Sequence, residues 1–319
     1  MVIKLPGNLE DAINNVSELI EERLGELLQP SVSQQTVLSF DGKMATLDPE
    51  HEELDTVIEA MRYSALSGGK RLRPFLTVAS SNLFGVAGDS AITAASAIEL
   101  VHTYSLVHDD LPAMDDDDLR RGKPSCHIEF GEAAAILAGD ALLTYAFEVL
   151  SDEKTHADPQ VRCNLIQAVS KAAGVHGMVG GQMMDMEAEN EELEADEIIR
   201  LQRMKTGELF ALSCETGAIL GKAPRNMRTV LRAYAHDMGL AFQITDDLLD
   251  AEGTREDTGK EVNKDKIAGK ATLVSVLGVD HAREQAERLA NQAKMHLSVF
   301  DNRADLLRDL ATFVVERKH

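Results

Sequence analysis

Apolar residues recur at helical spacing along most of the chain. Five of them follow the i, i+3, i+4, i+7 spacing of one helix face: Leu54, Val57, Ile58, Met61 and Ala65. We expect this helix to begin at Asp48, with Pro49 in its first turn, and to end at the pair Gly68–Gly69. The stretch from about Ser90 to Asp110 is apolar nearly all round, which predicts a helix that is buried on most sides.

The same spacing predicts helices throughout the rest of the chain. They cover roughly 131–150, 160–178, 196–220, 226–251, 271–297 and 303–317. No alternating run of β-branched residues is long enough to require a sheet, and Gly and Pro follow no fixed repeat. The expected fold class is therefore all-α, with residues 1–319 forming a single multi-helix domain around one core.

Composition and charge exclude several classes of protein. The chain has 319 residues, 44% of them hydrophobic, so we expect a packed core rather than general disorder. Its 32 basic and 54 acidic residues give a net charge of −22, which repels nucleic acids and anionic lipids.

The cysteines and the N-terminus indicate a compartment. Cys126, Cys163 and Cys214 lie far apart without metal-ligand spacing, as free thiols in a reducing compartment do. The N-terminus does not resemble a signal peptide, and no uncharged apolar run reaches the ~18 residues of a membrane helix. We expect a cytoplasmic protein with no membrane span.

The densest chemical signal is an acidic cluster directly after the most apolar predicted helix. Residues 109–118 hold six carboxylates in ten positions and are followed by Arg120 and Arg121. Ionised carboxylates at this density repel one another unless cations lie between them. An EF-hand is excluded, because a loop counted from Asp115 reaches Cys126 at the position that needs a Glu.

A second acidic set lies far downstream, in residues 243–250. On a helix, Gln243, Asp246 or Asp247, and Asp250 share one face. Oxygen-rich clusters without His or Cys favour Mg²⁺ over zinc or copper. Two such sets that face each other could hold several Mg²⁺ ions around a diphosphate.

Basic groups complete a predicted polyphosphate site. They are Lys70 and Arg73, Arg120 and Arg121, Lys205, and Lys260 and Lys270. The last two belong to 253–270, a charged, Gly-containing segment without apolar periodicity that we interpret as a candidate lid. Residues 185–197 hold eight acidic side chains in thirteen positions, which is typical of a solvated loop and helix start.

Six segments, in this order, resemble the short-chain trans-isoprenyl diphosphate synthases, most closely the bacterial farnesyl diphosphate synthases. They are GGKRLRP (68–74), DDxxxxD (109–115), DDLRRGKP (117–124), GGQ (180–182), MKTG (204–207) and QITDDLLD (243–250). The resemblance covers about Leu54 to Leu277, with Thr245 a small departure from the motif's frequent Gln. It implies the all-α isoprenoid synthase fold, a deep cavity, and a homodimer.

The resemblance also implies a role for each motif residue. Three Mg²⁺ ions would be bound by Asp109, Asp110, Asp115, Asp246, Asp247 and Asp250. The allylic diphosphate would be bound by Arg120, Lys205, Lys260 and Lys270, with Thr206 and Gln243 lining the ionisation site. The diphosphate of isopentenyl diphosphate would be bound by Lys70, Arg73, His102 and Arg121.

Tyr104 bears on the length of the product. It lies five residues before Asp109, about 7.5 Å deeper along a helix at ~1.5 Å per residue. The resemblance associates an aromatic residue here with a C15 product, because the ring would form the floor of the cavity. The alternative is an ordinary buried Tyr with a bonded hydroxyl, which leaves a C20 product open.

Other functions remain as alternatives. A geranylgeranyl diphosphate synthase differs only in cavity depth, and a non-catalytic subunit of a heteromeric synthase would usually lack one aspartate motif. A terpene cyclase fits poorly with the GGKRLRP segment and with an aromatic content of 4%. An acidic calcium-binding scaffold fits poorly with the failed EF-hand count and the basic clusters.

Overall fold

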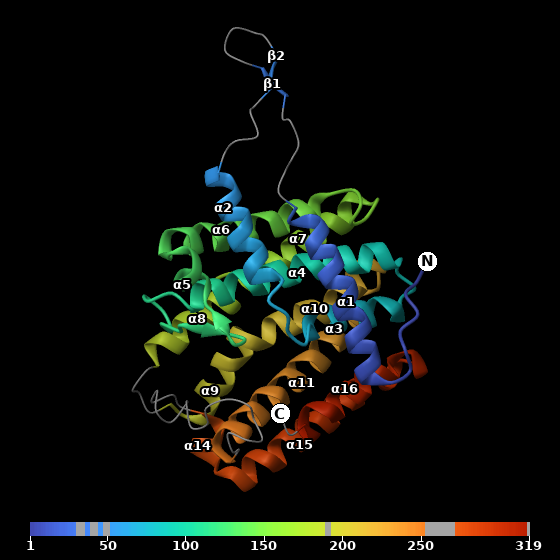
Figure 1. The fold of residues 1–319 in the computed structure, drawn as a ribbon. Helices are drawn as coiled ribbons and strands as arrows, with labels where there is room; N and C mark the ends of the chain where they lie inside the picture. Colours follow the sequence, from blue (N-terminus) through green and yellow to red (C-terminus); the bar gives the residue numbers. More distant parts are fainter. Residues whose placement is uncertain (30–35, 39–43, 47–51, 189–192, 253–271, 318–319) are drawn as a thin grey trace.

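The computed structural model describes residues 1–29, 36–38, 44–46, 52–188, 193–252 and 272–317, and the fold is all-α as expected (Figure 1). Its first helices, in chain order, are α1 (Leu9–Leu27), α2 (Glu52–Ala65), α3 (Leu72–Leu83), α4 (Gly88–Asp109), α5 (Cys126–Phe130), α6 (Glu132–Ser151) and α7 (Pro159–Ala173). They are followed by α8 (Met178–Glu187), α9 (Ala195–Gln202), the π-helical turn η1 (Arg203–Gly207), α10 (Glu208–Leu220) and α11 (Arg225–Glu252). The C-terminal part holds α14 (Leu273–Leu277), α15 (Val279–His296), the 3₁₀ turns η2 (Leu297–Val299) and η3 (Asn302–Ala304), and α16 (Asp305–Glu316).

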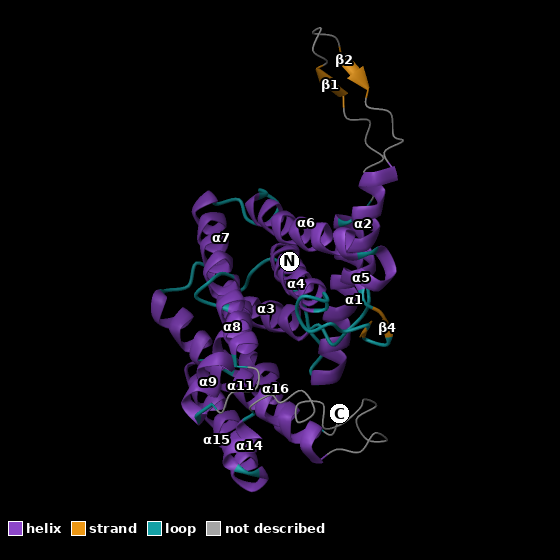
Figure 2. Ribbon diagram, turned by 90° about the vertical axis from the view of Figure 1, so that its left-hand side faces the viewer, coloured by secondary structure: helices purple, strands orange, loops and turns teal. Residues whose placement is uncertain are grey.

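Strands occur only as two short antiparallel hairpins within the described ranges. β1 (Thr36–Leu38) pairs with β2 (Met44–Thr46), and β3 (Leu119–Arg120) pairs with β4 (Lys123–Pro124) (Figure 2). The second hairpin positions the basic pair that follows the first acidic cluster. Arg121 in its turn has a φ of 54°, in the left-handed region.

Helix α4 runs through the centre of the bundle, as its apolar sequence predicted. Fifteen of its 22 residues are buried, and α3, α6 and α10 pack around it (Figure 1). Close approach of α6 requires Gly139, because a Cβ there would lie 2.0 Å from His108 Nε2. The buried core is continuous from Ala12 in α1 to Val314 in α16.

Several predicted helix boundaries were wrong in detail. Helix α3 and helix α8 were not predicted, and the predicted helix 196–220 is interrupted by η1. The predicted helix 271–297 is broken at Gly278, whose φ of 78° suits a residue without a Cβ. The predicted start at Asp48 and Pro49 lies outside the described residues.

One described helix, α6, is long and apolar enough to cross a membrane by length and composition. Ala135, Ala138 and Leu142 on one side of it are fully buried in the core, whereas Ile136 and Leu137 on the other side are 44% and 54% exposed. A core helix with an exposed apolar face satisfies the same criterion, so the finding does not indicate a membrane span.

Candidate active site

A cavity of about 560 Å³ opens among α3, α4, α8 and η1, and it gathers many of the predicted site residues. Its predicted members are Arg73, His102, Tyr104, Asp109, Lys205 and Thr206. Much of the remaining wall is apolar, from Leu106, Leu111, Ala113, Met114, Ile136, Met178, Val179, Met183 and Met186. Charged groups therefore lie beside a surface that suits a hydrocarbon chain.

The Asp109 carboxyl group lies on the cavity wall and makes no ion pair within 4 Å among the residues that the structure describes. Burial raises its pKa to about 6, and the charges of Asp115 and Asp110 raise it further, while Lys205 and Arg120 lower it. The Asp115 N–H donates to the Asp109 carbonyl at 2.8 Å, which holds the loop against the end of α4. A cation beside Asp109 would offset these costs of burial and repulsion.

Asp110 has a different environment. Its side chain is 2% exposed and accepts hydrogen bonds from Arg120, with 2.9 Å between Nε and Oδ1. Burial raises the Asp110 pKa, and the bond from Arg120 opposes that shift. The structure therefore places Asp110 and Arg120 against each other in a separate small pocket, and neither lines the cavity.

A basic cluster surrounds His102 on the inner side of the cavity. The Arg73 Nη1 atom lies 3.2 Å from His102 Nε2, and the Arg73 guanidinium lies 4.6 Å from the centre of the Phe210 ring. Burial lowers the Arg73 pKa to about 10. Burial, with the charges of Arg73 and Arg121, lowers the His102 pKa well below its usual range, so the ring is neutral and accepts from Arg73.

The GGKRLRP segment explains how Arg121 reaches this cluster. The Arg121 side chain donates to the Gly68 carbonyl and, at 3.3 Å, to Ser67 Oγ. A Cβ on Gly69 would lie 2.8 Å from the Arg121 Cζ atom, and the Gly69 φ of 124° is a conformation that favours glycine. Lys70, the third basic residue predicted here, is exposed.

Arg71 is a site-supporting residue to which the sequence analysis assigned no role. It is 4% exposed, and its Nη1 lies 2.6 Å from Glu99 Oε1 in a buried ion pair. Its Nη2 donates to the Ala65 carbonyl at 2.7 Å. The ion pair with Glu99 of α4 gives Arg71 a structural role, and this pair cannot be read from the motif, which also contains Lys70 and Arg73.

The turn η1 presents Lys205 and Thr206 to the cavity, and α8 holds it there. Lys205 Nζ lies 2.5 Å from Asp185 Oδ2, so Asp185 belongs to the site and not to a solvated acidic segment as predicted. A Cβ on Gly181 would lie 2.2 Å from the Lys205 backbone nitrogen, which explains the GGQ motif as a close helix contact.

Gln182 is another residue whose role the sequence did not reveal. It lines the cavity and is 8% exposed, and neither atom of its amide has a hydrogen-bond partner in the described part of the chain. Burial of an amide without hydrogen bonds lowers the stability of the fold unless a ligand or water supplies the missing bonds. Its place in the GGQ motif was the only sequence signal.

The second aspartate set, on α11, is paired with other protein groups and does not line the cavity. Asp246 Oδ1 lies 2.5 Å from Arg317 Nη2, and the Arg317 guanidinium lies 3.9 Å from the Phe242 ring centre. Asp247 is 5% exposed and accepts from Gln243 Nε2 at 3.1 Å and from Gln202 Nε2 at 3.3 Å. Asp250 lies one turn further along α11 and is partly exposed.

No three Asp, Glu, His or Cys side chains form a ready metal site among the residues that the structure describes. The physical reason is that carboxylates without cations either separate or pair with bases, as Asp110 and Asp246 do. The all-oxygen donor set and the raised Asp109 pKa fit a divalent cation. Lys260 and Lys270, with the candidate lid, lie outside the described residues.

Comparison with known proteins gives consistent matches along most of the chain. The family model described as "Polyprenyl synthetase" matches residues 55–305. Farnesyl diphosphate synthase of Escherichia coli is 44% identical over 266 residues, which is 82% of this chain and 89% of that protein. Geranylgeranyl diphosphate synthase of Cyanophora paradoxa is 43% identical over 267 residues, 82% of this chain and 88% of that protein.

The solved structures agree with these matches. The crystal structure of an FPP/GFPP synthase from Zymomonas mobilis superimposes with a TM-score of 0.82 at 45% identity. That match covers 97% of this chain and 99% of the other. The fold is therefore shared over nearly the whole length.

Proposed function

This chain belongs to the polyprenyl synthetase family, and we propose that it condenses isopentenyl diphosphate with dimethylallyl and then geranyl diphosphate to form farnesyl diphosphate. It is a trans-prenyltransferase of isoprene biosynthesis. The observation that supports this most directly is the composition of one cavity. The carboxyl group of Asp109, the Arg73–His102 cluster and a long apolar wall line the same space.

Mg²⁺ is the cofactor we propose, held by Asp109, Asp115 and Asp246 with Asp110, Asp247 and Asp250 in support, at three ions per site. When bound, it supplies Lewis-acid stabilisation of the charge that develops on the departing diphosphate. The donors are oxygens only, which is the set that Mg²⁺ prefers. The acidic net charge of the chain makes such cations, together with local arginines, necessary for an anionic substrate.

The two diphosphates occupy different cation clusters in this proposal. Arg73, His102 and Arg121, with Lys70 at the surface, bind isopentenyl diphosphate. Lys205 and Arg120 bind the allylic diphosphate, where the Lys205 ammonium turns from Asp185 to the phosphate oxygens. The Gln182 amide lies close enough to this region to complete its bonds with bound substrate or water.

The reaction follows from that arrangement. The C–O bond of the allylic diphosphate breaks and its electron pair leaves with diphosphate, which Lys205 and Arg120 stabilise. The double bond of isopentenyl diphosphate attacks the allylic cation and forms the new C–C bond. Loss of a proton to the departing diphosphate restores a double bond. The methionine-rich wall from α8 excludes water, which would otherwise turn the cation into an alcohol.

We further propose a homodimer in which a second copy covers the exposed apolar face of α6 and α8. Leu137, Val179 and Met183 are 54%, 49% and 53% exposed there, and Val179 and Met183 also line the cavity. Apolar residues that cluster on a surface mark an interaction site, and here the partner closes the open side of the cavity. Leu137→Asp should convert a dimer into a monomer in analytical ultracentrifugation, and a wild-type monomer would contradict the proposal.

The proposed domain covers residues 1–319, since the core is continuous from the first to the last helix. A reducing, cytoplasmic location fits the three free cysteines, of which Cys163 is exposed. Isopentenyl and allylic diphosphates are the proposed partners, without nucleic acid.

A product assay tests the function. Labelled isopentenyl diphosphate and dimethylallyl diphosphate are incubated with the enzyme and Mg²⁺, with and without EDTA, and the products are separated by chain length. We expect a Mg²⁺-dependent C15 product. A C20 product would favour the geranylgeranyl alternative, and no condensation would contradict the proposed reaction.

A further inference from the structure

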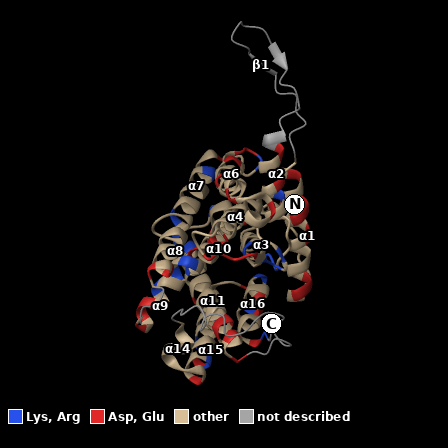
Figure 3. Ribbon diagram, turned by 60° about the vertical axis from the view of Figure 1, so that its left-hand side comes forward, with Lys and Arg blue, Asp and Glu red and all other residues tan. Residues whose placement is uncertain are grey.

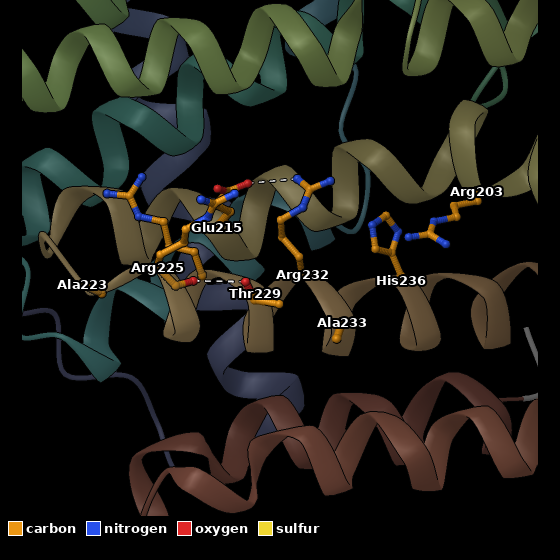
Figure 4. Close-up of a pocket in the computed structure, with 9 residues that line it drawn as sticks. Arg203, Glu215, Ala223, Arg225, Thr229, Arg232, Ala233 and His236 are labelled. Atoms are coloured by element: carbon orange, nitrogen blue, oxygen red, sulfur yellow. Dashed lines mark hydrogen bonds and ion pairs between the residues drawn. The ribbon is translucent and has the colours of Figure 1, made fainter.

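A cavity of about 700 Å³ lies between α10 and α11 and borders η1 through Arg203 (Figure 4). None of the residues around the active-site cavity lines it. Four arginines do: Arg203 from η1, and Arg225, Arg228 and Arg232 from α11. We call it the arginine cavity.

The α11 residues of the arginine cavity form one stripe. Arg225, Arg228, Arg232 and His236 are separated by three or four positions, so they share a face of the helix. Figure 4 shows Arg203 beside His236 at one end of the stripe and Arg225 at the other. Figure 3 shows Lys and Arg in blue and Asp and Glu in red along the ribbon.

This arrangement costs free energy in the absence of a ligand. Like charges at i, i+3 and i, i+4 destabilise a helix, and Arg225 and Arg228 lie in the first turns of α11, where the helix dipole disfavours cations. The chain has 54 acidic residues, yet within the described ranges Arg232 alone among the arginines of the stripe forms ion pairs. An anion held between the arginines removes both costs.

The carboxylates of the arginine cavity neutralise only part of its charge. Glu208 and Glu215 both pair with Arg232, at 2.8 and 2.9 Å. Arg203, Arg225 and Arg228 make no ion pair with any residue in the described ranges. Three guanidinium groups thus remain available beside a common space.

Two buried polar atoms on α11 also lack partners in the described structure: His236 Nδ1 and Arg228 Nε. His236 Nε2 lies 3.5 Å from Glu208 Oε1. Its Nδ1 faces η1, 3.4 Å from where a Cβ on Gly207 would lie. The cavity therefore adjoins the same turn that presents Lys205 and Thr206 to the active site.

We propose that the arginine cavity is a binding site for a diphosphate group, separate from the two diphosphate sites of catalysis. Guanidinium groups bind phosphate oxygens in bidentate fashion. The stripe from Arg225 to Arg232 spans about 10 Å at ~1.5 Å per residue, which suits two linked phosphates better than one. The site stands on its own geometry and does not depend on the proposed reaction.

Calorimetric titration of the full chain with inorganic diphosphate, in EDTA, tests the site. We expect Arg228→Gln to weaken one class of binding by at least about 10-fold, and Arg228→Glu to abolish it. Arg288→Gln is the matched control, because Arg288 is an exposed arginine of α15 whose side chain bonds to Gln285, outside the arginine cavity. Circular dichroism establishes that each variant is folded.

The Arg73→Gln background separates this site from the active site. If the Arg73→Gln protein still binds inorganic diphosphate, and adding Arg228→Gln removes that binding, the result supports a site for free diphosphate. If the Arg73→Gln protein binds geranyl diphosphate but not inorganic diphosphate, and Arg228→Gln removes that binding, the site is assigned to the head group of a prenyl diphosphate. The proposal is overturned if the affinity for both probes is the same in Arg228→Gln, in Arg288→Gln and in the parent.

Discussion

The active-site cavity and the arginine cavity border the same π-helical turn and differ in how their cations are balanced. Both contain a neutral histidine whose pKa is lowered by burial and nearby arginines, His102 in one and His236 in the other. Only the active-site cavity adds an unpaired carboxyl group, Asp109, and an apolar wall. Catalysis at a diphosphate needs metal ligands and a dry surface for the hydrocarbon, whereas binding needs positive charge alone.

The largest effect should come from Asp109→Asn, which removes a proposed metal ligand from one cavity and leaves the other unchanged. Because the charge on the departing diphosphate loses part of its stabilisation, kcat should fall by about 10²–10³-fold. Steady-state assays over a range of Mg²⁺ concentrations measure the fall. Asp116→Asn, an exposed neighbour in the same loop, is the control. Equal activity of the two variants would remove Asp109 from the mechanism.

A smaller loss should follow from Asp185→Asn. Asp185 pairs with the Lys205 ammonium, which is proposed to bind the allylic diphosphate. Misplacement of such a group can cost up to about 10²-fold, so we expect a decrease in kcat of roughly 10-fold. The KM for isopentenyl diphosphate should stay near that of the parent, since its cations lie elsewhere. Asp185→Glu should restore part of the rate. A rise in KM with kcat unchanged would assign Asp185 to substrate binding instead.

Tyr104→Ala should change the product more than the rate. The Tyr104 ring lines the cavity, packs edge-on against His108 and is 6% exposed, and its hydroxyl donates no hydrogen bond within the described residues. Removal of the ring deepens the cavity, so products should lengthen from C15 toward C20. Chromatography of the dephosphorylated products measures this. Tyr145→Ala, whose hydroxyl bonds Leu27 outside the cavity, should keep C15. An unchanged C15 product from Tyr104→Ala would exclude the ring as the floor.

The smallest effect is a pH dependence of stability that the arginine cavity contributes. Burial and the charges of Arg203 and Arg232 lower the His236 pKa from 6.5 to about 4, although Glu208 opposes the shift. The unfolded chain therefore binds this proton at a higher pH than the folded chain does. The free energy of unfolding should be level above pH ~6.5 and decrease as the pH falls toward ~4.

Urea denaturation at several pH values measures that dependence. His236→Gln should make the decrease shallower, while His281→Gln, at an exposed position of α15, should match the parent. The two variants would show the same slope if His236 were protonated alike in both states.

Local patterns predicted part of the molecule. Helical periodicity predicted the all-α fold and a helix α4 that is buried on most sides. Arg73, Asp109, Lys205 and Thr206, picked out by their motifs, and His102, implied by the family resemblance, line one cavity, whereas the second aspartate set does not. Residue type and the face of a single helix can be read from the sequence, and these were the bases of the predictions.

Partners across helices were not predictable in the same way. Asp185 was assigned to a solvated segment, yet it pairs with Lys205 across two elements. Helices α3 and α8 were not predicted. In α8 the structure uses Gly181 to bring the helix against η1, a close contact between elements that the sequence does not display.

The sequence alone determined the fold class, the motif chemistry and the arginine stripe on α11, because these depend on residue type and on the periodicity of single helices. Tertiary structure alone decided which charges meet. It paired Asp110 with Arg120 and Arg71 with Glu99, and it left Arg203, Arg225 and Arg228 without an ion pair within 4 Å in the described structure. Charge pairing depends on distances of a few ångströms between helices that are remote in the chain, and no single segment encodes those distances.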